Sequence, residues 1–497
     1  LPISTTFNVG VGYRAGLSIT TGANNTAIGA DSLRSNTTAS NNTAVGYQAG
    51  YSNTTGTQNQ AFGVQALYTN TTGSNNVALG YQPLYTNNGD ANIGIGYRAM
   101  YSNSSGSLNV AIGQSALQAN TTASNNTAVG YQAGYSNTTG VALNAFGMQA
   151  LQANTTGAGN SAFGGYHVGQ YQAALFSNTT GNYNSAFSSG ALANNTTGSS
   201  NVAIGWAALQ ANTTASNNTA VGYQASYSNT VNSNTTVGYQ AGYSNTTGGV
   251  TAVGFTALYA NTTGAANTAM GWRTLDANTT GGYNTAFGEE SLGSNTTASY
   301  NTAVGYQAAY ANTTGTGLVV VGRAALYTNT TGSSNTAVGN IALYANTTGN
   351  YNAAFGESTL SANTTASGNS GFGHEALSAN TTGANNVAVG LQALKSNTTA
   401  SNNTAVGYQS LYSNTTASNN TAVGYQAGYS NTTGAVNALG YQAAYSNTTA
   451  TGIVAIGYQA NYANQTGNQV TAVGTLCLSS NTAGANTAMG FAAMNAN

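Results

Sequence analysis

The chain has 497 residues and a net charge of −1, with only six Lys or Arg and seven Asp or Glu. Charged residues make up 3% of it, against about 25% in an ordinary soluble domain, which excludes electrostatic binding of nucleic acid or of an anionic membrane surface as its main activity. Two His and one Cys leave little material for acid–base, thiol or metal chemistry, so we expect no enzyme activity, no catalytic residue, no metal site and no cofactor.

The chain offers no targeting or membrane signal. No apolar run approaches the roughly 18 residues that a membrane-spanning helix needs, so we expect no membrane span. The first residues, Leu1-Pro2-Ile3, include neither an initiator Met nor a signal peptide, which indicates a processed chain or a fragment. The lone Cys477 excludes a disulfide framework.

A short repeat is the main feature of the sequence. A glycine that follows a small residue and a bulky apolar residue recurs from Gly12 to Gly490, and Ser188 takes its place once. We name this position the repeat glycine; with Ser188 it occurs 29 times, and the step to the next one is seventeen positions in 22 cases, sixteen in five and twenty-four in one. A period kept over the whole chain predicts a solenoid, that is, one continuous array over residues 1–497.

The predicted elements alternate in chain order between a strand at the repeat glycine and a turn after it. The first regular copy has the strand segment Thr43-Ala44-Val45-Gly46 and the turn segment Asn53-Thr54-Thr55-Gly56. Recurrent Gly, Asn and Thr without a 3.6-residue period disfavour helix and favour short strands with Asn/Gly turns. We therefore predict an all-β fold, a β-solenoid or β-roll of about 29 rungs with a 17-residue repeat.

Within each predicted strand the side chains alternate between two faces. The small Ala faces a narrow interior, while the bulky residue beside the repeat glycine points the other way and needs burial against another face or another chain. A second apolar column is expected four positions after the repeat glycine, where Leu is frequent: Leu67, Leu84, Leu117, Leu151, Leu209, Leu258, Leu326 and Leu343.

The recurring Asn-Asn-Thr-Ala-Val-Gly-Tyr-Gln-Ala, for example from Asn41 to Ala49 and from Asn125 to Ala133, resembles the head repeats of YadA-like trimeric autotransporter adhesins. It is also similar to repeats of phage tail-fibre proteins. The YadA-like repeat is shorter than the repeat of this chain, and these 497 residues show no stalk, anchor or chaperone segment. The resemblance implies a place outside the cell, on a cell or virion surface, and a homotrimer that would bury the bulky column.

Stacked rungs would place tyrosines in two columns. Tyr directly follows the repeat glycine twelve times, and it occupies the fifth position after that glycine fifteen times. One interpretation is a ladder of stacked rings that stabilises the sheet. The other is a stripe that binds a surface glycan or a receptor.

Asn-Thr-Thr recurs 23 times, and each copy is an N-glycosylation sequon. The structural interpretation is a turn whose stacked amides form a hydrogen-bonded ladder; the alternative is a glycosylated surface, which would replace charge in keeping the chain soluble. Sequons about 4.8 Å apart would crowd large glycans. The candidate glycosylation sites are Asn36, Asn53, Asn70, Asn120, Asn137, Asn154, Asn212, Asn245, Asn261, Asn278, Asn295, Asn312, Asn329, Asn346, Asn363, Asn380, Asn397, Asn414, Asn431 and Asn447.

Nine of the thirteen charged residues lie in the two positions after the repeat glycine, which marks this corner as solvent-facing. Some of them lie exactly one repeat away from an opposite charge or a His and would meet it in the next rung. A catalytic Glu–His dyad is disfavoured because no nucleophile or oxyanion donor accompanies it. The candidate inter-rung pairs are Arg14 with Asp31, Arg273 with Glu290, and Glu357 with His374.

The one long interval, from Gly164 to Ser188, contains seven extra residues at 165–171. In a solenoid such a segment is extruded as a loop. We consider it either a neutral insertion or a recognition loop with Tyr166, His167 and Tyr171 as the candidate contacts.

Together these features predict an extracellular structural fibre or filament subunit, glycosylated, that associates with itself end to end or as a homotrimer. One alternative is an adhesin or phage tail-fibre shaft that binds a surface glycan or receptor. Another is an ice-binding solenoid, although Asn-Thr-Thr presents only one regular Thr column because neighbouring residues of a strand face opposite ways.

Overall fold

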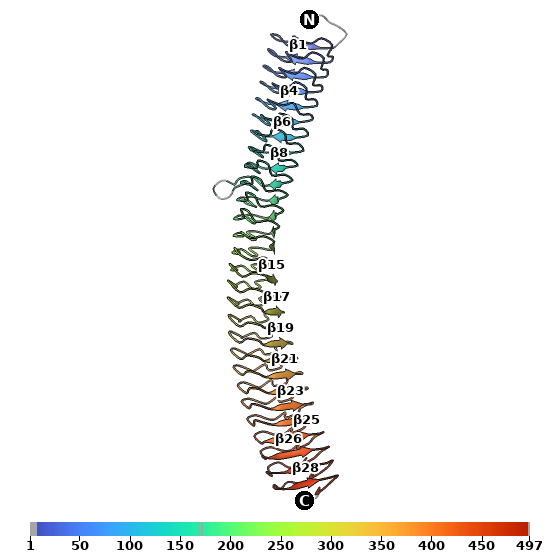
Figure 1. Cartoon of the computed structure of the whole chain (residues 1–497), viewed down its shortest axis with the longest axis vertical. Coiled ribbons are helices and arrows are strands. Elements are labelled where there is room, and N and C mark those ends of the chain that lie inside the picture. The colour runs from blue at the N-terminus through green and yellow to red at the C-terminus, as the bar shows by residue number, and fades with distance from the viewer. Residues whose placement is uncertain (1–6, 168, 170–171, 496–497) are drawn as a thin grey trace. The chain divides into compact units, whose positions relative to one another are not determined.

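The computed structural model describes residues 7–167, 169 and 172–495, and the chain divides into two compact units, residues 1–250 and 251–497. Each unit is a β-solenoid in which one short parallel strand per repeat stacks on the next (Figure 1). The described residues form 29 strands and no helix, as the repeat predicts.

Every strand lies directly before a repeat glycine. The strands of the first unit are β1 (Val9–Val11), β2 (Thr26–Ile28), β3 (Thr43–Val45), β4 (Gln60–Phe62), β5 (Val77–Leu79), β6 (Ile93–Ile95), β7 (Val110–Ile112), β8 (Thr127–Val129), β9 (Asn144–Phe146), β10 (Ser161–Phe163), β11 (Ser185–Phe187), β12 (Val202–Ile204), β13 (Thr219–Val221) and β14 (Thr235–Val237). Strand β15 (Val250–Val253) begins at the last residue of that unit.

The second unit repeats the arrangement. Its strands are β16 (Asn267–Met270), β17 (Thr285–Phe287), β18 (Thr302–Val304), β19 (Val319–Val321), β20 (Thr336–Val338), β21 (Ala353–Phe355), β22 (Ser370–Phe372), β23 (Val387–Val389), β24 (Thr404–Val406), β25 (Thr421–Val423), β26 (Val436–Leu439), β27 (Ile453–Ile456), β28 (Thr471–Val473) and β29 (Thr487–Met489).

Neighbouring strands pair in parallel and in the register of the repeat. Ala27 of β2 lies opposite Ala44 of β3. Across the long interval that holds the insertion, Ala162 of β10 still lies opposite Ala186 of β11. Equivalent positions therefore stack into columns, and the seven extra residues leave the ladder intact.

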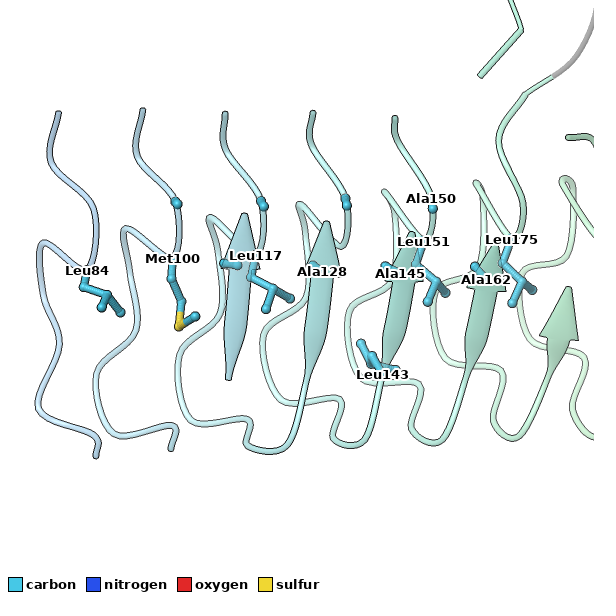
Figure 2. Packing of buried hydrophobic residues seen from close by; sticks show 14 of the residues in the cluster. Leu84, Met100, Leu117, Ala128, Leu143, Ala145, Ala150, Leu151, Ala162 and Leu175 are labelled. Atoms are coloured by element: carbon cyan, nitrogen blue, oxygen red, sulfur yellow. The ribbon is translucent and has the colours of Figure 1, made fainter. Parts of the chain in front are cut away.

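The core of each unit is a row of small and medium side chains. In most strands the residue before the bulky one is an alanine that points inward and is buried, as for Ala128 and Ala145. Leucines four positions after the repeat glycine are buried beside this row, and Met100 is buried in the same place (Figure 2). Burying a leucine contributes about 1.5–3 kcal/mol, so the two predicted inward columns supply the apolar core.

The bulky residue directly before the repeat glycine points outward, as predicted. Among the described residues this column is only partly covered: Phe163 is 36% exposed and Ile204 is 41% exposed. Phe146, Phe163 and Phe187 stack on one another with ring centroids 4.8 Å apart.

The repeat glycine is required by the approach of the next rung. Gly46 has φ of 139°, and a Cβ there would lie 2.4 Å from the carbonyl oxygen of Gly63. No L-residue fits both conditions without strain. Ser188 adopts φ of 114° in the equivalent place, so the one rung without the glycine keeps the same backbone at an energetic cost.

The segment after the repeat glycine, which the sequence predicts to be a turn, has a regular backbone conformation with hydrogen bonds to both neighbouring rungs. Gln48 and Leu67 adopt left-handed φ of 55° and 54°. The amide of Gln48 donates to the carbonyl of Ala30 in the preceding rung at 2.9 Å, while that of Gly50 donates to Ala66 in the following rung at 2.8 Å. Hydrogen bonds in both directions therefore tie this segment to its neighbours.

Candidate functional site

The sequon asparagines form a buried ladder. Asn53 Nδ2 donates to Asn36 Oδ1 in the preceding rung and to the carbonyl of Gly56 in its own rung, both at 2.9 Å. A second buried column lies four positions before the repeat glycine, where the backbone N–H of Asn42 donates to Asn25 Oδ1 at 2.9 Å. Asn42 Nδ2 also donates to Gly56 at 3.0 Å, so the two columns meet at one carbonyl.

This ladder corrects the expectation of glycosylation at the candidate sites. All twenty asparagines named above are at most 2% exposed. An N-linked glycan leaves from Nδ2, the atom that in Asn53 is buried and donates two hydrogen bonds. The folded solenoid has no room for a sugar there, and the structural interpretation of Asn-Thr-Thr accounts for the motif.

The two threonines differ in most copies of the motif. The first is half-buried, and its hydroxyl donates to the next rung, as from Thr54 Oγ1 to the carbonyl of Thr71 at 3.0 Å. The second, as at Thr55, is exposed. The order is reversed in β14, where Thr235 is exposed and Thr236 is buried. Asn-Thr-Thr thus presents a single exposed threonine column.

Both tyrosine columns are stacked ladders. In the fifth position after the repeat glycine, Tyr51, Tyr68, Tyr85 and Tyr101 stack with ring centroids 4.8–5.1 Å apart. In the position directly after it, Tyr425, Tyr441 and Tyr458 stack at 5.1 Å. Burial, followed by the neighbouring tyrosines, raises the pKa of Tyr85. The stacked rings therefore support the first interpretation of the two columns, a ladder that stabilises the sheet.

The outward column and the first tyrosine column lie side by side. We name the apolar residues directly before and directly after the repeat glycine the outer apolar stripe; the second of these positions also holds Glu289, Arg323, Glu357 and His374, which interrupt it. Its exposed members in the first unit include Ile28, Leu79, Tyr81, Tyr97, Ile112, Phe187, Tyr223 and Tyr239, and in the second unit Met270, Trp272, Val304, Tyr306, Phe355, Phe372, Val389, Leu391, Tyr441 and Tyr458.

The predicted ion pairs are partly right. Arg14 and Asp31 do not pair: the Arg14 guanidinium lies 4.8 Å from the Tyr13 ring centroid, and Asp31 lies 3.8 Å from Arg34 in its own rung. Arg34, three positions after Asp31 in the same rung, reaches the carboxylate of Asp31. A comparison of residues that lie a whole repeat apart does not find this pair.

Arg273 does reach Glu290, with Nη1 3.5 Å from Oε1. Its shorter contact is within its own rung, where Nε donates to Asp276 Oδ2 at 2.8 Å. Burial raises the pKa of Asp276 and outweighs the opposing effect of the Arg273 hydrogen bond. These three side chains line a cavity of about 260 Å³ that also touches Gly293, Ser294 and Tyr310. The sequence signal for this cavity is that Asp and then Gly occupy the fifth position after the repeat glycine in two successive rungs, a position where Tyr is common.

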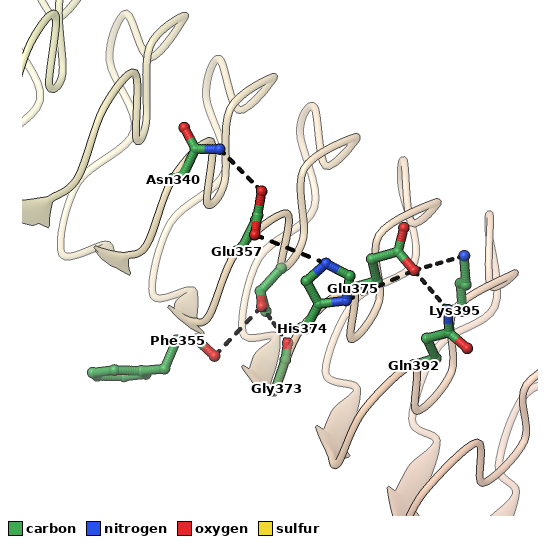
Figure 3. Close-up of polar contacts among 9 residues, drawn as sticks. Asn340, Phe355, Glu357, Gly373, His374, Glu375, Gln392 and Lys395 are labelled. Atoms are coloured by element: carbon green, nitrogen blue, oxygen red, sulfur yellow. Dashed lines mark hydrogen bonds and ion pairs between the residues drawn. The ribbon is translucent and has the colours of Figure 1, made fainter.

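Glu357 and His374 also meet, with Oε2 4.0 Å from Nε2 (Figure 3). The same His lies 4.0 Å from Glu375 through Nδ1, and Glu375 accepts hydrogen bonds from Lys395 Nζ and Gln392 Nε2, each at 2.7 Å. The hydrogen bond from Lys395 is the main reason that the pKa of Glu375 is lowered. The cluster is a network of partly exposed side chains along the solvent-facing corner.

The recognition candidates of the insertion are only partly described. Tyr166 is exposed, and its amide donates to the carbonyl of Met148 at 3.0 Å. His167 is exposed as well, and Tyr171 lies outside the described residues. The bond from Tyr166 belongs to the regular pattern, which is present again at Gln172, whose carbonyl accepts from Gly190 at 2.8 Å.

Among the described residues, no three His, Cys, Asp or Glu side chains gather as a metal site would require. The part of the chain that the structure describes also contains no helix with the length and apolarity to cross a membrane. No family model matches the chain, and no curated protein or solved structure does either.

Proposed function

We propose that the chain is the subunit of a structural fibre, in which copies lie side by side through the outer apolar stripe. The observation that carries the proposal is that the outward column is exposed or half-buried, and never fully buried, in the described rungs of each unit. Large exposed apolar patches on soluble proteins mark interaction surfaces, and 3% charged residues give this surface little else to keep it in solution.

The periodicity of the stripe favours a second copy of the chain as its partner. Apolar side chains recur along the stripe at the strand spacing of about 4.8 Å. Only a surface with the same spacing matches it over many rungs, and another copy of this chain has that spacing. The resemblance to YadA-like heads supports three copies per assembly and a place outside the cell, on a cell or virion surface.

The alternatives have less support. Glycosylation is not part of the proposal because the sequon asparagines are buried. Ice binding draws no support from the single exposed threonine column. A receptor- or glycan-binding role has one localised observation in its favour, the cavity beside Tyr310.

The test is the mass of the purified chain in solution, measured by light scattering, with a charged variant of the stripe. The triple variant Phe355→Glu, Phe372→Glu and Val389→Glu places three charges on adjacent rungs of the stripe. We expect a homotrimer for the unmodified chain and monomers for the variant, with an unchanged β-type circular dichroism spectrum.

The control places the same charges on the same rungs at exposed threonines, through Thr365→Glu, Thr382→Glu and Thr399→Glu. It should assemble like the unmodified chain. A monomeric unmodified chain, or a stripe variant that assembles as well as the control, would overturn the proposal.

A further inference from the structure

We propose that the gap in the tyrosine ladder at Gly293 is a binding site for one ring of a neutral saccharide. The inference goes beyond the fibre function and does not depend on it. In the fifth position after the repeat glycine, three successive rungs carry Asp276, Gly293 and Tyr310. Tyr310 stacks on Tyr327 with ring centroids 5.3 Å apart, and on its other side the ladder has no ring.

The edge of the Tyr310 ring lies close to Gly293, which has no side chain to cover it. A Cβ at position 293 would lie 3.1 Å from Tyr310 Cε2, so any side chain there would meet the ring. The space left is a cavity of about 260 Å³. Pockets for drug-sized ligands measure roughly 300–1,000 Å³, which makes this one suitable for a single sugar ring.

Two of the other interruptions of the ladder are filled by cations, while most carry a neutral residue such as Gln118 or Ser361. Where Arg34 replaces Tyr, its guanidinium lies 5.4 Å from the ring centroid of Tyr51 in the next rung. Where Lys395 does so, its ammonium lies 6.0 Å from that of Tyr412. One rung before Tyr310 the residue is Gly293, which has no side chain, and a cavity lies beside the ring instead.

The polar groups of the cavity are held in place and have spare hydrogen-bonding capacity. Arg273 fixes Asp276 at 2.8 Å and Glu290 at 3.5 Å, and Gln307 Nε2 donates to the second oxygen of Glu290 at 2.7 Å. The Arg273 guanidinium also lies 5.2 Å from the Trp272 ring centroid. Carboxylate oxygens accept further bonds, and a guanidinium has five N–H donors.

This combination fits the two chemical sides of a sugar. The C–H face of a pyranose stacks on the open face of Tyr310 in the place of the missing ring. Its hydroxyls donate to Asp276 and Glu290 and accept from Arg273. The two carboxylates and one guanidinium sum to a charge of −1, which repels anions, and a cation would have to displace Arg273 from both carboxylates.

The experiment measures binding of neutral trisaccharides that end in glucose, galactose or mannose to the full chain, by saturation-transfer NMR and by the fluorescence of Trp272. A sialylated trisaccharide and tetramethylammonium serve as the anionic and cationic probes. We expect at least one neutral trisaccharide to bind and neither charged probe to do so. Binding of only a charged probe, or of none, would overturn the proposal.

Variants then locate the binding. Gly293→Tyr restores the common residue of the ladder and fills the cavity, and Tyr310→Ala removes the stacking face; each should weaken binding about tenfold or more. The matched control Gln118→Tyr also restores a tyrosine, between Tyr101 and Tyr135, and should bind normally. Thermal unfolding of each variant separates loss of the site from loss of the fold. A folded Gly293→Tyr variant that binds as well as the control would disprove the site.

Discussion

At the scale of single residues, the backbone and side chains of the next rung limit which residue types fit at each position. The alanine at the centre of a strand faces the core, and the repeat glycine meets the backbone of the following repeat glycine at a distance that excludes a Cβ. The same restriction returns in every rung because equivalent positions stack. Ser188 is the exception, since it keeps φ of 114° with a side chain.

Replacing Ser188 by glycine should stabilise the first unit. Strain of about 1–3 kcal/mol at such a φ exceeds the extra unfolded-state entropy of glycine, about 0.5–1 kcal/mol, so we expect a net gain of about 1 kcal/mol. Urea unfolding followed by circular dichroism measures it. The reverse change, Gly205→Ser, should lower the midpoint; a Ser188→Gly variant with a midpoint at or below that of the unmodified chain would show that Ser188 is unstrained.

At the scale of one rung, no strand is stable without its neighbours. Each strand has three or four residues, and most of its hydrogen bonds and stacked rings reach the rung before or after. A buried asparagine joins two rungs through its amide. A stacked tyrosine likewise shields part of its neighbour.

Removing one buried amide should therefore destabilise more than removing an exposed side chain of the same motif. Asn312 Nδ2 donates to Asn295 Oδ1 at 2.9 Å, and Asn312 Oδ1 accepts from Asn329 Nδ2 at 2.8 Å. Asn312→Ala leaves both partners buried and without that bond, which we expect to cost about 2 kcal/mol or more. In urea unfolding, Thr314→Ala on the exposed side of the motif serves as the control and should change stability little; equal effects of the two would contradict the ladder's role.

The tyrosine ladders predict a loss of stability in alkali. Burial, followed by the neighbouring tyrosines, raises the pKa of Tyr85 and Tyr429 above 10.0. Their contribution is present below the unfolded pKa of about 10 and is lost as pH rises through the folded pKa. Absorbance of phenolate at 295 nm should show a late-titrating fraction, and Tyr429→Phe should reduce the loss of stability above about pH 10. Stability that is independent of pH in this range would contradict the prediction.

At the scale of the whole molecule, many equal nearest-neighbour contacts replace one large core. Stability in such a protein is approximately a sum over repeats and their interfaces. The same repetition turns one outward residue into the outer apolar stripe, and a departure such as Gly293 changes the surface in one place only. The stripe and the site are therefore tested separately, by assembly and by saccharide binding.

Much of this could be read from the repeat. The strand positions, the inward alanine and the buried leucine follow from the spacing and from the alternation of side chains in a strand. The pairs of Asp31 with Arg34 and of Glu375 with Lys395 could not be read from it. They depend on how the left-handed backbone after the repeat glycine directs its side chains, and the period of the repeat contains no information about that direction.

The sequence by itself determined an all-β solenoid with little charge, because a strict period forces identical positions to stack and composition does not depend on folding. Only the tertiary structure decided which polar groups are available. It buried the sequon asparagines, because their amides satisfy carbonyls of the chain, and it brought Arg273, Asp276 and Glu290 together at one cavity. Whether a side chain forms a structural hydrogen bond or is available to bind a ligand depends on its neighbours in the adjacent rungs. Those neighbours are known only once the rungs are stacked.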